Sequence, residues 1–83
     1  MTDPPKEING VIKADVTNQA FRGDLIVQAM WATDSAIVSD YAGNEVWEAT
    51  GEGQGVRFES GVELRGFKVA SGFGDVYVYL KMS

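Results

Sequence analysis

The chain has 83 residues, a length that accommodates one domain. It contains neither cysteine nor histidine, which excludes disulfides, thiolate chemistry, the usual zinc sites and Ser-His-Asp or Cys-His catalysis. Seven Lys and Arg against twelve Asp and Glu give a net charge of −5, which disfavours nucleic-acid binding. The apolar content of 45% is too high for a disordered chain. No apolar run reaches the roughly 20 residues of a membrane-spanning helix, so we expect no membrane partner.

Residues 1–9 are expected to form an extended N-terminal arm, and residues 10–83 a single β-domain. Pro4 and Pro5 lack amide donors and favour an extended backbone. We therefore expect the arm to reach a neighbouring subunit or another partner. Its first residues are polar and do not resemble a signal peptide, which indicates synthesis and retention in a cytosol.

Beyond the arm, apolar residues recur mainly with period two, and ten glycines interrupt the chain at short intervals. Short strands joined by glycine turns fit this pattern better than helices. In chain order, strands are expected at residues 11–16, 25–31, 36–40, 45–50, 56–60, 62–64, 67–70 and 75–82. Seven or eight short strands predict an all-β fold, either a small antiparallel β-sandwich, a jelly-roll-like domain or a barrel.

The segment 25–31 is apolar on both faces. A short helix over 24–32 is the alternative, but the β-branched pair Ile26 and Val27 favours a strand. A strand that is apolar on both faces must be covered on both. Either a loop overlies it, or Ile26 and Met30 contact another subunit. The second option suits a small domain without disulfides, because such domains often gain stability by oligomerising.

The two tryptophans and the last strand carry the remaining large side chains. Trp31 and Trp47 are expected to be core or near-core anchors, because each shares a row with small or apolar neighbours, Ala29 and Ala49 respectively. In the last strand, Val76, Val78, Leu80 and Met82 form one row, and Tyr77 and Tyr79 stand in the opposite row. Tyrosine is enriched at interfaces. The tyrosine pair therefore predicts a subunit interface, with cover by the chain itself or a ligand platform as alternatives.

No catalytic, cofactor or metal site is predicted. The glycine-rich loop at 51–55 lacks the Lys and Ser/Thr of a phosphate-binding loop and is expected to be a flexible connection. Asp40, Asn44 and Glu45 flank a predicted hairpin turn and could bind calcium, but the spacing of a calcium loop is absent.

Charge is uneven along the chain. Residues 40–63 hold six carboxylates against Arg57, and residues 64–83 hold three cations against Asp75. These charges are either solvated strand faces, with Arg57–Glu59 and Glu63–Arg65 pairs, or acidic and basic surfaces that meet when copies assemble.

Four segments together resemble small tailed-phage virion proteins of the capsid decoration (cement) type. They are LIVQAMW, IVSDYAGNEVWEA, VRFESGVELRGFKV and GFGDVYVYLKMS, and the resemblance covers about residues 23–83. It implies a structural virion protein without enzymatic activity that is made in the host cytoplasm. Proteins of this type bind the outer surface of the major capsid protein shell, often as homotrimers, and stabilise it. The resemblance transfers no binding residue.

Two other classes stay open beside a decoration protein. One is a β-sheet module that binds a receptor or carbohydrate, as in a phage tail or fibre, with Tyr41, Trp47 or Tyr77 as a stacking platform. The other is an enzyme, which would have to use Asp, Glu, Lys, Tyr, Ser or Thr because His and Cys are missing. We expect no enzymatic activity.

Overall fold

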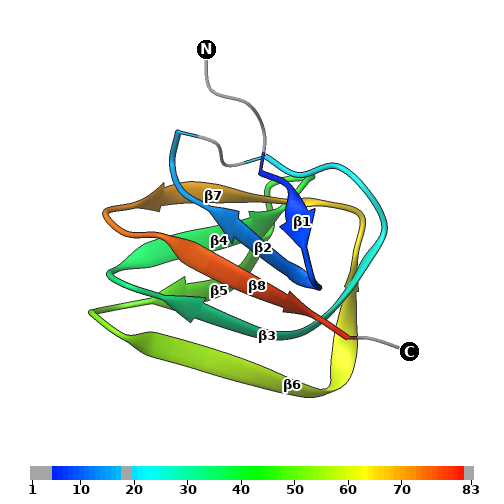
Figure 1. Cartoon of the computed structure of the whole chain (residues 1–83). Coiled ribbons are helices and arrows are strands. Elements are labelled where there is room, and N and C mark those ends of the chain that lie inside the picture. The colour runs from blue at the N-terminus through cyan, green and yellow to red at the C-terminus, as the bar shows by residue number, and fades with distance from the viewer. Residues whose placement is uncertain (1–4, 18–19, 82–83) are drawn as a thin grey trace.

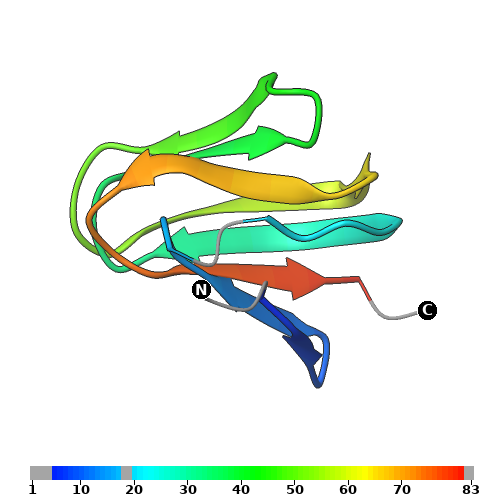
Figure 2. The same cartoon turned by 90° about the horizontal axis from the view of Figure 1, so that it is seen from above.

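The computed structural model describes residues 5–17 and 20–81, and its strands form two antiparallel sheets packed face to face (Figures 1 and 2). The large sheet has the order β1-β2-β8-β3-β6, and the small sheet the order β5-β4-β7. The eight strands are β1 (Glu7–Ile8), β2 (Val11–Ala14), β3 (Leu25–Ala32), β4 (Ala36–Asp40), β5 (Glu45–Ala49), β6 (Gln54–Leu64), β7 (Phe67–Gly72) and β8 (Val76–Leu80). The predicted all-β class is confirmed, and the two layers make it a sandwich. The described residues contain no membrane-spanning helix.

The core lies between the two sheets and is built from alternating residues of their inner faces. Phe67, in β7, is its largest fully buried side chain. The large sheet contributes Ile12, Ala14, Val27, Met30, Val76 and Val78, and the small sheet contributes Ala36, Val38, Ala49 and Val69. Trp47 packs against this core while remaining partly exposed, which confirms its predicted role.

One long strand replaces two predicted ones at 56–60 and 62–64. In β6, Arg57 pairs with Ala29, and Val62 pairs with Val27, so four residues of β6 lie opposite Gln28 alone. Against β8, by contrast, Gln28 is itself the extra residue, because Val27 faces Leu80 and Ala29 faces Tyr79. Gln28 is therefore the site of a β-bulge that both neighbouring strands share.

The bulge overturns part of the prediction for β3. An uninterrupted strand would place Ile26 and Met30 on the same face, because residues four apart share a side. With one extra residue between them, Ile26 points outward and is 45% exposed, whereas Met30 points inward and is 1% exposed. Met30 is therefore a core residue of its own chain and is not available to a partner.

Two residues of the predicted N-terminal arm belong to the β-domain. Glu7 and Ile8 form β1, which pairs with β2 at the edge of the large sheet. Pro5 is already buried in the isolated chain, so it does not present a free surface to a partner. Pro4 lies outside the described residues, as does Met82. The strand predicted at 11–16 ends at Ala14, and Val16 is exposed rather than in the core.

Candidate functional site

The outer face of the large sheet carries most of the side chains that the sequence pattern predicts for binding. Cross-strand pairing places Lys13, Tyr77, Trp31 and Gly55 in one row. A second row contains Val11, Tyr79, Ala29 and Arg57. We call the surface formed by these eight residues and Ile26 the outer sheet face.

Trp31 is the largest side chain on the outer sheet face. It is 39% exposed and lies on the side of the sheet away from the core, so its predicted place in or near the core is wrong. Its ring lies beside that of Tyr77, with 6.0 Å between centroids and 46° between planes. Gly55 makes room for the indole, because a Cβ there would lie 2.9 Å from Trp31 Cδ1. The sequence placed Trp31 and Ala29 in one row correctly but assigned that row to the wrong side.

Tyr77 and Tyr79 occupy the outer sheet face as their alternation predicted. Both are half-buried, whereas Val76 and Val78 on the opposite side of β8 are fully buried. Their neighbours on this face come from β2 and β3, the two strands that flank β8. The sheet thus presents two tyrosines and a tryptophan on one surface.

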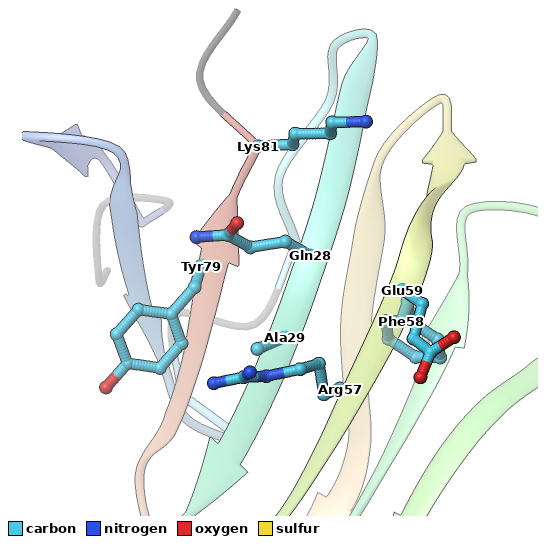
Figure 3. A pocket seen from close by; sticks show the side chains of 7 residues that line it. All are labelled: Gln28, Ala29, Arg57, Phe58, Glu59, Tyr79 and Lys81. Atoms are coloured by element: carbon cyan, nitrogen blue, oxygen red, sulfur yellow. The ribbon is translucent and has the colours of Figure 1, made fainter.

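A groove of about 550 Å³ crosses the outer sheet face at the bulge. Its lining residues are Gln28, Ala29, Arg57, Phe58, Glu59, Tyr79 and Lys81 (Figure 3). Arg57 extends from β6 over Ala29 towards Tyr79, and Glu59 points away from Tyr79. The small side chain of Ala29 leaves room for Arg57 above it. Sequence reasoning missed this groove because the alternation pattern does not reveal the bulge at Gln28.

The calcium alternative at the β4–β5 turn is not supported by its geometry. The backbone N–H of Asn44 donates to Asp40 Oδ1 at 2.8 Å, and its side-chain amide donates to Asp40 Oδ2 at 3.2 Å. These hydrogen bonds, the backbone one first, hold the pKa of Asp40 below its ordinary value. Both carboxylate oxygens of Asp40 thus accept hydrogen bonds within the turn. In residues 5–17 and 20–81, no three acidic side chains gather as metal ligands.

The glycine-rich loop is a tight connection between β5 and β6. The side chain of Gln54 ties the loop to its start, because Gln54 Oε1 accepts a hydrogen bond from the backbone N–H of Thr50 at 2.6 Å. Gly53 has a φ of +65°, a conformation that favours glycine. The glycines therefore serve turn geometry and the packing of Trp31.

The predicted charge arrangement is wrong in two respects. Within the described residues the ion pair is Lys13–Asp75, at 3.6 Å, and not Arg57–Glu59 or Glu63–Arg65. The two charge blocks also do not form separate surfaces, because Arg65 lines a recess together with Asp40 and Glu63.

The arrangement of the outer sheet face suits non-covalent binding. It offers aromatic area, a small-residue floor and the hydrogen-bonding groups of Gln28, Arg57 and Lys81. No protein-family model matches the chain, and neither does a curated protein or a solved structure. A function is therefore inferred from these surfaces.

Proposed function

We propose that the protein is a structural virion protein of the capsid decoration type, which binds the outer surface of the capsid and stabilises it as a homotrimer. The observation that carries the proposal is the outer sheet face, on which the exposed Trp31 lies beside the half-buried Tyr77 and Tyr79. The decoration role, the trimer and the capsid partner derive from the resemblance, and the outer sheet face supplies an adhesive surface for them.

Aromatic side chains on a rigid sheet are well suited to protein binding. Tyr and Trp bury much area with few rotatable bonds, and together with Arg they dominate the energetics of protein interfaces. Here the rings sit in the middle of the sheet, on β3 and β8, and Arg57 stands beside them on β6. A partner that covers this face would desolvate the rings without reordering the backbone.

A second candidate is saccharide binding in the groove at Gln28. Tyr79 offers a ring for stacking, and Gln28, Arg57 and Lys81 offer hydrogen-bond donors around it. The residues proposed here for stacking on a saccharide differ from those predicted from the sequence, which were Tyr41, Trp47 or Tyr77. Trp47 packs against the core and Tyr41 lies at the β4–β5 turn, so Tyr77 alone of the three belongs to the outer sheet face.

The test is co-sedimentation with capsids assembled from the major capsid protein of the phage that encodes this chain. Wild-type protein should bind, and Tyr79→Asp should weaken binding at least tenfold because it buries a charge in the contact. Ala70→Asp, which adds the same charge at an exposed position of β7 in the small sheet, is the matched control and should bind normally. Failure of the wild type to bind, or equal binding by Tyr79→Asp, would contradict the proposal. Binding to a glycan array that is lost in Arg57→Gln would support the second candidate instead.

A further inference from the structure

The β7–β8 turn presents the most exposed large apolar side chain in the described part of the chain. Phe73 is 89% exposed. Its backbone is nevertheless tightly held, because the N–H of Phe73 donates to the carbonyl oxygen of Ser35 at 3.0 Å. An aromatic ring on a fixed backbone loses little conformational entropy when it enters a partner's recess. Phe73 therefore has the properties of an interface anchor.

The residues on either side of Phe73 lock the turn against the β3–β4 connection. A Cβ at Gly72 would lie 2.7 Å from the carbonyl oxygen of Ser35, and one at Gly74 would collide with Thr33 Oγ1. Beyond Gly74, the backbone N–H of Asp75 donates to Thr33 Oγ1 at 2.8 Å, and the N–H of Thr33 donates to the Asp75 carbonyl at 3.0 Å. The turn is thus rigid as well as exposed.

The surroundings of Phe73 are apolar at the centre and acidic at the rim. Val16 and Ile37 line a recess of about 480 Å³ together with Phe73. Carboxylates of Asp15, Asp34, Glu48 and Asp75 lie at this end, as the pairing of β2 with β8 and the lining of the recess place them, and Lys13 pairs with Asp75. We call this end the Phe73 end. Two Phe73 ends meeting about a twofold axis would bring like charges together, which disfavours that contact.

The opposite end carries an exposed tyrosine with cations. Arg22 Cζ lies 4.8 Å from the centroid of the Tyr41 ring, and Lys68 Nζ lies 5.9 Å from it. Neither cation forms an ion pair within residues 5–17 and 20–81. Beside Tyr41 is a recess of about 510 Å³. Its other lining residues are Ala42, Leu64, Arg65, Asp40 and Glu63, and the Asp40 carboxylate is occupied by Asn44.

The strand register places these two features at opposite ends of the small sheet. Ala36 of β4 pairs with Gly72, next to Phe73, and Asp40 pairs with Phe67, next to the Tyr41 turn. Five residues of strand separate the ends by roughly 17 Å. Figure 2 shows the β7–β8 turn at the left of the sandwich and the β4–β5 turn at the right.

We propose that copies of this chain associate head to tail, with the Phe73 end of one copy seated at the Tyr41 recess of the next. The inference rests on the proposed self-association and names its interface. The Phe73 ring enters the Tyr41 recess against Ala42 and Leu64, and Arg22 and Lys68, beside the Tyr41 ring, face the carboxylates of the Phe73 end. A head-to-tail contact that closes forms a ring, in which every copy presents its outer sheet face in an equivalent orientation to the ring axis. Such a ring would bind a capsid surface with the avidity of several linked contacts.

The test uses two variants that each disable one half of the interface. Phe73→Ala removes the anchor, and the double variant Arg22→Glu, Lys68→Glu reverses the charge of the receiving end. Sedimentation velocity should show an oligomer for the wild type and a monomer for each variant alone. An equal mixture should form dimers, because one intact half comes from each variant. Circular dichroism should show both variants folded, and the alanine double variant at Arg22 and Lys68 replaces the glutamates if it does not.

Several outcomes overturn the head-to-tail contact. A monomeric wild type, an oligomeric charge-reversed variant or a mixture that stays monomeric each contradicts it. Tyr79→Asp separates this inference from the proposed function. It should leave the oligomer intact while weakening capsid binding. Dissociation of the oligomer by Tyr79→Asp alone would show that copies meet at the outer sheet face, as the sequence predicted, and would overturn the head-to-tail contact.

Discussion

Trp31 and Tyr77 are direct cross-strand partners on the outer sheet face, and their rings lie 6.0 Å apart between centroids. Residues 46 positions apart in sequence thus form one aromatic surface, because β3 and β8 are neighbours in the large sheet. The pair lies at the centre of the proposed adhesive surface.

The ring contact should contribute a measurable coupling energy. In a double-mutant cycle of Trp31→Ala and Tyr77→Ala, we expect the two losses of unfolding free energy to be non-additive by about 0.5–1.5 kcal/mol. Urea titration followed by circular dichroism measures this. Tyr77→Phe retains the ring and should keep most of the coupling, whereas strictly additive losses would mean that the two rings do not interact.

Met30 and Ile26 should differ sharply in their contribution to stability. Met30→Ala leaves a cavity in the core and should cost about 2–5 kcal/mol of unfolding free energy. Ile26→Ala, on the exposed side of the same strand, should cost less than about 1 kcal/mol. Urea denaturation of the two variants tests the bulge at Gln28. Equal costs would contradict the assignment of the two residues to opposite faces.

Gly74 and Gly51 form a matched pair for a steric test, because neither has a left-handed backbone. A Cβ at Gly74 would lie 2.6 Å from the backbone nitrogen of Asp34, whereas the nearest atom at Gly51 is 3.7 Å away. Gly74→Ala should therefore destabilise by about 1–3 kcal/mol. Gly51→Ala should be neutral or slightly stabilising. Thermal unfolding compares the two, and a harmless Gly74→Ala would contradict the close packing of the Phe73 turn.

Ser39 should be replaceable with a gain in stability. Its Oγ is buried and has no hydrogen-bond partner among the described residues. A buried hydroxyl without a partner carries a desolvation penalty, so Ser39→Ala should raise the unfolding free energy by about 1 kcal/mol. Chemical denaturation measures the change. A loss of stability instead would indicate that the hydroxyl makes a hydrogen bond.

Asp40 should make stability depend on pH in the acid range. Hydrogen bonds from Asn44, chiefly its backbone N–H, lower the pKa of Asp40 in the folded state from the ordinary 3.8. The folded state thus favours the carboxylate, and this contribution is present above the unfolded pKa and lost as the pH falls through the lower folded pKa. The stability advantage of wild type over Asp40→Asn should shrink between about pH 5 and pH 2. Urea denaturation of both proteins at several pH values measures this. A difference in unfolding free energy that stays constant across the range would contradict the lowered pKa of Asp40.

The sequence by itself determined the class of the fold and most strand positions. Period-two alternation in residues such as Val76 to Leu80 distinguishes the two faces of a strand, and glycine turns separate the strands, so an all-β fold follows from local rules. The hairpin turn after Asp40 was also predictable, because Gly43 and Asn44 are residues that favour turns. In the structure, Gly43 adopts a φ of +98° there. Composition alone likewise limited the chemistry, since the chain has no His and no Cys.

Only the tertiary structure decided which face of β3 is buried at each position and which side chains meet. The bulge at Gln28 arises from simultaneous pairing with β6 and β8, and it moved Met30 into the core and Trp31 onto the surface. Single-chain alternation cannot contain that information, because register depends on the partner strands. The same holds for Phe73 and Tyr41, whose positions at opposite ends of the sandwich depend on how β4 and β7 pair.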